Sequence, residues 1–353
     1  MKGQIRRVSC VVALAAAAAI AGCSSSSSSG SSSSPGSSSA NPTKLNVALG
    51  ASTLLYAPVY IAADEGYFTQ EGLSVTQDQV VASASIQALT SGSVQLAFVA
   101  SESYLLAKEK NISPIAIQAN NTGNTGSYLV ASTKYLAKKH ITASDPLSER
   151  MQAMKGATIG YTTAGAISQI NAEYMLEQAG IPVKDANLVQ VGGGTAADAA
   201  LERGSIDMEF TAPPDVESLV ASGAGVLLIN AIKEFPLMAS QPYSVVLADP
   251  SWLKANASTA TKFTTAIAKA INFIDSNPTK AGTLLQTKFP TVKASVLQQG
   301  LGAMLPTYTE GGAMTEAMWQ NAIQLGKEAG TLSGNLSPAE GQLWTNQYIS
   351  SGS

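Results

Sequence analysis

LNVALGASTLLYAPVYIAADEGYFTQEGLSV, residues 45–75, has the pattern of a strand, a helix and a second strand. Apolar residues alternate in its first five positions, which predicts a half-buried strand. Gly50 ends this strand, and Pro58 suits the first turn of the helix that follows. Gly72 then turns the chain into a second strand near Val75. Two strands joined by a helix within about thirty residues form a βαβ unit, so a parallel sheet is predicted.

An internal repeat indicates a second unit of the same kind. Residues 88–98 read ALTSGSVQLAF, and residues 200–210, which lie 112 positions further on, read ALERGSIDMEF. Both segments have an Ala-Leu pair, then a Gly-Ser turn, then alternating apolar residues. Solenoid repeats are only about 20–45 residues long, so this spacing indicates two similar α/β domains.

The composition describes a globular protein with few residues suited to metal or thiol chemistry. The chain has 353 residues, enough for two domains, and is 45% hydrophobic and 13% charged. Its formal net charge of −3 gives no reason to expect nucleic acid as a partner. The one histidine is His140, and the two cysteines are Cys10 and Cys23, which excludes most metal and thiol catalysis. We therefore expect neither a metal nor a cofactor.

The first 43 residues have the pattern of a targeting segment and a tether. Basic residues precede a short apolar run at residues 8–20, as in a signal peptide, whereas a bilayer crossing takes roughly 20 apolar residues. Ile20-Ala21-Gly22-Cys23 resembles a bacterial lipobox, so we expect a signal peptide over residues 1–22 and lipidation at Cys23. An ordinary cleaved signal peptide with a chance cysteine is the alternative. Residues 23–43 are rich in serine and predict a flexible tether.

Residues 45–75 resemble the nitrate, sulfonate, taurine and thiamine-precursor branch of the substrate-binding proteins of ABC transporters. The residues that carry this resemblance are Gly50, Pro58, Ala62, Gly66, Tyr67, Phe68, Gly72, Leu73 and Val75. The resemblance implies a type II periplasmic binding protein fold, with two doubly wound α/β domains joined by a hinge of two chain crossings. It places domain one at residues 44–125 and 251–353, completed by C-terminal helices, and domain two at residues 126–250. A strand at residues 243–247 should lead the chain back toward domain one.

Ligand-binding residues are expected where parallel strands end, because ligands of open α/β sheets bind outside the carboxyl ends of the strands. The residues at those ends are mostly Ser, Thr, Asn and Gly at helix starts, where free backbone N–H groups favour an anion or another hydrogen-bond acceptor. The alternative is that they only cap their helices. The candidates are Ser52, Thr53, Tyr56, Ser83, Ser85, Ser101, Glu102, Asn121, Thr163, Gly165, Gly194 and Thr195.

The expected charge of the ligand depends on Glu102. As an exposed helix cap, Glu102 would leave the cleft to a small anion such as a sulfonate or nitrate, and we favour this interpretation. If it faces the cleft, the ligand is expected to carry an amine, as a thiamine-type pyrimidine precursor does. No arginine decides the question, because Arg150 and Arg203 lie outside the predicted ligand loops. Residues 50–58 also lack the Asp-Trp-x-Pro-Asn-like string that is usual in the family's thiamine-precursor binders.

The resemblance implies an exported solute-binding lipoprotein that captures a small molecule by hinge closure and delivers it to an ABC permease. We expect a monomer held by its lipid at the outer face of the cytoplasmic membrane, or in the periplasm. A sensor, or an enzyme on the same scaffold, is the alternative. The pyrimidine-synthesising relatives need a histidine and a cysteine-rich motif, whereas this chain has His140 alone and no free thiol after Cys23. Gly192-Gly193-Gly194 is not followed by the Lys-Ser/Thr of a phosphate-binding loop, so nucleotide binding is not expected.

Overall fold

The computed structural model describes residues 41–50, 52–80 and 82–350, and the side chains of all of these except residues 82 and 83. The predicted signal peptide, Cys23 and the tether up to residue 40 lie outside the described residues. Within the described part of the chain, none of the helices has both the length and the apolar character needed to span a membrane.

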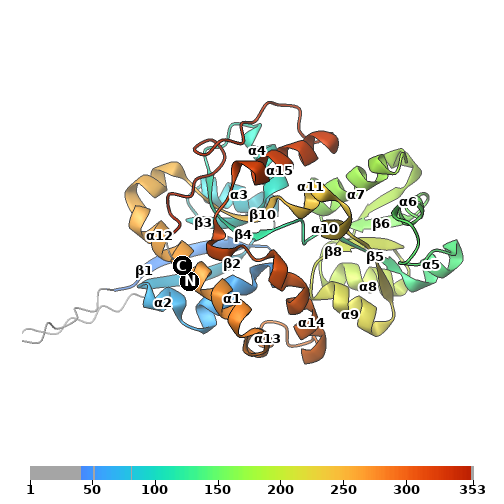
Figure 1. The fold of residues 1–353 in the computed structure, drawn as a ribbon, viewed down its shortest axis with the longest axis horizontal. Coiled ribbons are helices and arrows are strands. Elements are labelled where there is room, and N and C mark those ends of the chain that lie inside the picture. The colour runs from blue at the N-terminus through green and yellow to red at the C-terminus, as the bar shows by residue number, and fades with distance from the viewer. Residues whose placement is uncertain (1–40, 51, 81, 351–353) are drawn as a thin grey trace, which may run out of the picture. The chain divides into compact units, whose positions relative to one another are not determined.

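Two five-stranded sheets form the framework of the described chain (Figure 1). The first has the order β2-β1-β3-β10-β4 and the second the order β7-β6-β8-β5-β9. The first consists of β1 (Thr43–Leu49), β2 (Leu73–Gln79), β3 (Leu96–Ala100), β4 (Ile115–Thr122) and β10 (Pro242–Ala248). The second consists of β5 (Tyr128–Ser132), β6 (Thr158–Tyr161), β7 (Asn187–Gln190), β8 (Met208–Thr211) and β9 (Gly225–Asn230). We call each sheet, with the helices packed against it, a lobe.

The βαβ unit predicted at residues 45–75 is confirmed. β1 pairs in parallel with β2, and α1 (Ala57–Asp64) and α2 (Tyr67–Gln70) connect the two strands. The prediction of a parallel sheet is wrong for two strands: β10 runs antiparallel to β3 and β4, and β5 runs antiparallel to β8 and β9. The reason is that the chain enters each sheet from the other lobe through these strands, without the crossover helix that a parallel connection needs.

The internal repeat extends to the pairing of the strands. Val47 lies opposite Leu96 in the first sheet, and Ile159 lies opposite Met208 in the second. Both members of the second pair lie 112 positions after their counterparts in the first, which is the spacing of the sequence repeat. The same spacing therefore builds equivalent frameworks, with β10 in one and β5 in the other beside the central strand.

Helices cover both sheets, and the C-terminal ones complete the first lobe, as the resemblance implies. α12 (Pro250–Ser276) packs on α1 and shares a buried core with β1, in which Phe68 and Phe263 stack with ring centroids 5.4 Å apart. Burying one such ring stabilises the fold by about 1.5–3 kcal/mol. The remaining helices are α3 (Ala82–Thr90), α4 (Ser101–Lys108), α5 (Thr133–Lys139), α6 (Leu147–Gln152), α7 (Ile167–Gln178), α8 (Thr195–Arg203), α9 (Asp215–Ser222), α10 (Ala231–Glu234), α11 (Pro236–Ala239), α13 (Pro278–Leu285), α14 (Ala294–Met304) and α15 (Glu316–Glu328).

Two short crossings join the lobes. Residues 123–127 lead from β4 to β5, and residues 240–241 lead back into β10. The crossings lie side by side, because the N–H of Gly123 donates to the carbonyl of Gln241 at 2.9 Å. β10 pairs with β3 and β4, so the chain is already in the first lobe from residue 242. The predicted end of domain two at residue 250 therefore lies several residues too late. The other predicted domain bounds stay a prediction.

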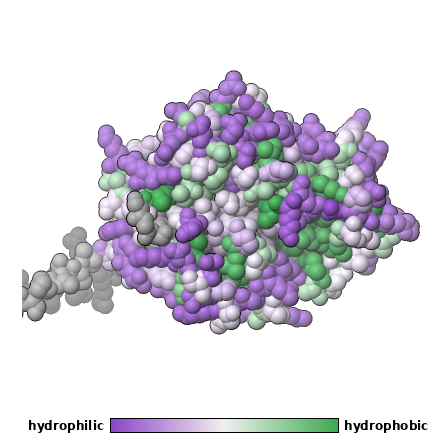
Figure 2. Space-filling model, viewed as in Figure 1, coloured by the Kyte–Doolittle hydropathy of each residue, from purple (hydrophilic) through white to green (hydrophobic). Residues whose placement is uncertain are grey.

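Hydrophilic side chains cover most of the face seen in Figure 2, with smaller hydrophobic patches between them. Among the described residues, the large hydrophobic side chains that are highly exposed are Val183 and Val220. Most of the other large apolar side chains are buried in the cores of the lobes.

Candidate ligand-binding site

A cavity of about 340 Å³ lies between the two lobes. Its walls come from the ends of β1 and β3 and the short helix η1 (Leu54–Tyr56) in the first lobe, and from the ends of β6 and β8 and the start of α9 in the second. These are the carboxyl ends of parallel strands, where ligands of open α/β sheets bind. Ligand pockets have volumes of roughly 300–1,000 Å³, so this cavity suits a small molecule.

Aromatic side chains form much of the cavity wall. Tyr56 meets Phe98 edge to face, with ring centroids 5.8 Å apart. The hydroxyl of Tyr56 lies over Gly50, where an added Cβ would come within 2.7 Å of it. The hydroxyl of Tyr243 lies over Gly126 in the first crossing, where an added Cβ would come within 2.0 Å of it. Glycine at these two positions therefore makes room for two tyrosines of the wall.

Two carboxyl groups of the second lobe, Glu209 and Asp215, lie in the same wall, and the described residues that line it include no Lys, Arg or His. Glu209 on β8 is only 1% exposed, and its Oε1 has no hydrogen-bond partner. Burial, together with the charges of Asp198 and Asp215, raises the pKa of Glu209 to about 9. Burial also raises the pKa of Asp215 to about 6. Glu209 is therefore a buried acid on the surface of a cavity.

Four of the predicted site residues line the cavity: Thr53, Tyr56, Thr163 and Gly194. Thr53 also caps η1, since its Oγ1 accepts a hydrogen bond from the N–H of Leu55 at 3.3 Å. Helix capping and a position on the cavity wall are therefore combined in one side chain.

The other predicted residues are not part of the cavity lining. Ser52, Gly165 and Thr195 are exposed. Ser85, Ser101 and Asn121 are buried. The buried amide of Asn121, for example, donates to Thr125 Oγ1 at 2.7 Å, within the protein. The side chain of Ser83 lies outside the described residues. A role in ligand binding stays a prediction for all of these residues.

Glu102 is not an exposed helix cap, and that prediction is wrong. It is 3% exposed, and its Oε1 accepts hydrogen bonds from Asn124 Nδ2 at 3.0 Å and Gln241 Nε2 at 2.8 Å. Both donors belong to the crossings, which cover the first turn of α4. Burial raises the pKa of Glu102 to about 7, although its hydrogen bonds act in the opposite direction. Because Glu102 does not line the cavity either, its place is in the hinge rather than in the solvent or the cleft.

Glu209 and Asp215 are not among the residues predicted from the sequence. The sequence does give a signal for Glu209, because it is the one charged residue of a fully buried strand. Burying an acid is costly, so an acid in such a strand indicates a specific role. The repeat places Ala97 at the equivalent position of the first sheet, so this acid is specific to the second lobe. Asp215 leaves a weaker signal: it follows the end of β8 closely, in the strand-end segment from Thr211 to Asp215 where ligands are expected, but an acid in the first turn of a helix is ordinary.

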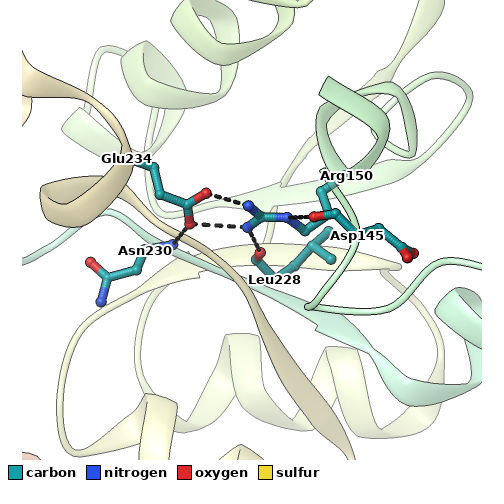
Figure 3. A network of polar contacts seen from close by, with 5 residues as sticks. All are labelled: Asp145, Arg150, Leu228, Asn230 and Glu234. Carbon is teal, nitrogen blue, oxygen red and sulfur yellow. Dashed lines mark hydrogen bonds and ion pairs between the residues drawn. The ribbon is translucent and has the colours of Figure 1, made fainter. Parts of the chain in front are cut away.

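Arg150 is engaged elsewhere in the second lobe (Figure 3). Its guanidinium pairs with the Glu234 carboxylate and donates to the Leu228 carbonyl at 2.7 Å. Its Nε donates to the Asp145 carbonyl at 2.8 Å, and Glu234 also accepts from the N–H of Asn230 at 3.0 Å. The network ties α6 to β9 and α10, and Arg150 has no place in the cavity lining.

The chain matches a protein family and two relatives by sequence. The family model described as NMT1/THI5 like matches residues 55–281. The chain is 25% identical over 240 residues to the "Putative binding protein YtlA" of Bacillus subtilis (strain 168), which covers 67% of this chain and 68% of that protein. It is 23% identical over 310 residues to 4-amino-5-hydroxymethyl-2-methylpyrimidine phosphate synthase of Aspergillus parasiticus, which covers 85% of each chain.

The fold is similar to that of a solved binding protein. The alkanesulfonate-binding protein SsuA from Xanthomonas axonopodis pv. citri, bound to MOPS, superimposes with a TM-score of 0.68 and 14% identity. The match covers 84% of this chain and 96% of that one. This likeness confirms the predicted fold of two α/β lobes joined by a hinge.

Proposed function

Because the chain belongs to the NMT1/THI5-like family, we propose that it is the solute-binding protein of an ABC importer. The observation that carries the proposal is a cavity between two lobes that are connected through two short crossings. Such a molecule closes over its ligand by hinge motion, and a permease that recognises the closed form receives the ligand.

A contact across the cleft supports closure as the mechanism. The N–H of Leu54 in the first lobe donates to the carbonyl of Pro213 in the second at 3.0 Å. Ala212, next to Pro213, is buried in a cluster made mainly of first-lobe side chains. Opening the cleft breaks these contacts. A ligand that touches both walls binds the closed form more tightly than the open form, and this difference in affinity shifts the protein toward the closed form.

The ligand that suits this wall best is a small molecule that donates hydrogen bonds. The similarity to an alkanesulfonate-binding protein supports the small anion expected from the sequence. The wall itself supports the amine-bearing alternative, because it contains Glu209 and Asp215 and the described lining residues include no basic side chain. Burial raises the pKa of Asp215 only to about 6, so this carboxylate is charged at neutral pH and would repel an anion in the cavity at short range.

We propose a binding role rather than catalysis. One relative is a synthase by name, so the enzyme alternative has some support. Against it, the described residues of the cavity lining include no His, which is the commonest general base, and no Cys or Lys that could act as a nucleophile.

We also propose that the protein is exported and acts as a monomer anchored at the membrane through lipidated Cys23. The support is the sequence alone: a signal-like segment ends in Ile20-Ala21-Gly22-Cys23. The serine-rich tether predicted at residues 23–43 would let the folded lobes reach a permease.

Native mass spectrometry of protein purified without dialysis tests the proposed function. We expect a one-to-one complex that releases an intact small molecule on denaturation. Prolonged incubation separates the two roles: a binder returns the molecule unchanged, and an enzyme returns a product. A protein that carries no molecule, and that remains empty after exposure to a lysate of small metabolites, would contradict the proposal.

A further inference from the structure

Glu209 leaves a hydrogen-bonding position open in the cavity wall. It lies on β8, opposite Val130 of β5 and paired with Gly160 of β6. It is 1% exposed, it lines the cavity, and its Oε1 accepts no hydrogen bond. Leaving a buried polar group of this kind unsatisfied is unfavourable. A bound molecule that donates a hydrogen bond to Glu209 would remove that penalty.

The helices beside Glu209 contribute more acids. They are Asp198 on α8 and Asp215 and Glu217 on α9, and Asp198 Oδ1 and Glu217 Oε2 are also buried without a partner. Burial, helped by the charge of Asp215, raises the pKa of Asp198 and of Glu217 to about 7. Tyr128 on β5 is another titratable residue nearby, and burial and the Glu217 charge raise its pKa.

No protein cation offsets this group of acids within the described chain. The ion pairs found there involve other carboxylates: Glu234, Asp185, Glu71, Glu65 and Asp64. The wall of the second lobe is therefore acidic and has an open hydrogen-bond acceptor.

Aromatic rings complete the cavity. The rings that line it are those of Tyr56, Phe98, Tyr161, Phe210 and Tyr243. The face of an aromatic ring attracts an organic cation. An acid without a basic partner and several rings together form an environment that suits a cation with an apolar body.

A metal ion fits this wall less well than an organic cation. In the part of the chain that the structure describes, no three His, Cys, Asp or Glu side chains are placed so that they could hold a metal ion. Hard cations also take several oxygen ligands, which an aromatic wall does not offer.

Resting on the proposed function, we infer that the cavity binds a small organic cation whose N–H group donates to Glu209 and whose body packs between the aromatic rings. In the empty protein Glu209 keeps its proton at neutral pH, because burial holds its pKa near 9. On binding, the carboxyl O–H bond breaks, the proton passes to water and the carboxylate pairs with the cation. Binding of one cation thus displaces about one proton from this site.

Titration calorimetry with three probes of similar shape tests the inference. The probes are benzylamine, benzyl alcohol and benzenesulfonate, which are a cation, a neutral molecule and an anion at neutral pH. We expect benzylamine to bind about tenfold more tightly than the other two, or better. Heats measured in phosphate and in Tris buffer should show that it releases about one proton.

Glu209→Gln keeps the shape of the side chain and removes its charge. We expect this variant to bind benzylamine about tenfold more weakly, to release no proton, and to bind benzyl alcohol within about threefold of the parent protein. Glu177→Gln is the matched control, because Glu177 is an exposed acid on α7, outside the cavity lining. If circular dichroism shows that Glu209→Gln is unfolded, Asp215→Asn is tested instead, and we expect it to bind benzylamine more weakly than the parent protein does.

Tighter binding of benzenesulfonate than of benzylamine would overturn the inference. Benzylamine binding that neither variant weakens, or a lack of binding of all three probes, would overturn it as well. In each of these cases the proposed function still stands if native mass spectrometry finds a bound solute. An empty protein in that experiment contradicts the proposed function itself.

Discussion

The carboxylate of Glu102 and the side-chain amide of Gln241 share a 2.8 Å hydrogen bond, although 139 residues separate them in the chain. Glu102 lies in the first turn of α4 in the first lobe, and Gln241 ends the second crossing. The same Oε1 accepts from Asn124 of the first crossing at 3.0 Å. The Asn124 amide in turn donates to Asn171 on α7 of the second lobe at 3.3 Å. One carboxyl group therefore connects both crossings and, through Asn124, both lobes.

The empty protein should lose stability as the pH rises. Burial raises the pKa of Glu102 from 4.5 to about 7, and that of Glu209 from 4.5 to about 9. The folded state therefore holds these protons more tightly than the unfolded state does. Their contribution to stability is complete below about pH 4.5 and is lost as the pH rises through about 7 and then about 9. For Glu102 alone the loss is about 3 kcal/mol at most.

Urea unfolding at pH 5 and pH 8 measures this loss. The free energy of unfolding should differ less between the two pH values in Glu102→Gln, because the contribution of Glu102 is removed. The amide oxygen of the glutamine can still accept the hydrogen bonds of the crossings. Glu316→Gln, which changes an exposed acid on α15, should leave the difference unaltered. A parent protein as stable at pH 8 as at pH 5 would show that these acids are not buried as described.

Binding of a cation should tighten as the pH rises. Glu209 is protonated in the empty cavity below about pH 9, so a cation must displace a proton to pair with it. Displacement becomes easier at higher pH, and we expect the affinity for benzylamine to rise by up to about tenfold per pH unit between pH 6 and pH 8. Calorimetry at three pH values measures the slope. In Glu209→Gln the slope should fall toward zero, and an equal slope in both proteins would contradict the role of Glu209.

Gly126→Ala should destabilise the protein and weaken ligand binding. The added Cβ would lie 2.0 Å from the hydroxyl of Tyr243, which is buried and lines the cavity. Overpacking of this kind costs about 1–3 kcal/mol, and a displaced Tyr243 changes the cavity wall. Thermal unfolding and probe titration measure the two effects.

Gly302→Ala is the matched control for that substitution. Nothing lies within 4 Å of an added Cβ at Gly302, which is exposed in α14. Alanine is the better helix former, so stability should rise by up to about 1 kcal/mol. Equal stability of Gly126→Ala and Gly302→Ala would be evidence against the described position of Tyr243.

Ligand should shift the protein toward the form in which Leu54 N–H meets the Pro213 carbonyl. A ligand that touches both lobes stabilises the closed arrangement more than an open one, so the ensemble becomes more compact. Small-angle scattering should show a smaller radius of gyration with the co-purified solute than without it. An identical scattering profile with saturating solute and without solute would contradict hinge closure.

Cys23→Ala should move the protein from the membrane fraction to the soluble fraction. A cysteine that carries several acyl chains holds a protein firmly at a membrane, whereas a single chain gives only marginal binding. Fractionation of cells that express the parent or the variant, followed by immunoblotting, measures the change. Sedimentation of the variant with membranes would disprove the lipobox interpretation.

Local patterns in the sequence determined the framework of this protein. The βαβ unit at residues 45–75 and the repeat at residues 88–98 and 200–210 depend on alternation and turns within a few positions. Thr53 and Tyr56 could be predicted for the cavity wall because they closely follow a strand, at the carboxyl end where ligands bind.

The positions of the acids depended on tertiary structure. An acid at a helix start has the same local pattern whether water or protein covers it, and Gln241 covers Glu102 only because β10 returns the chain to the first sheet. Glu209 occupies a short apolar strand, and it becomes part of a cavity wall only where the second lobe faces the first. Burial and contacts between distant segments set the proton affinity of both acids, so the sequence alone did not determine the charge that the site presents to a ligand.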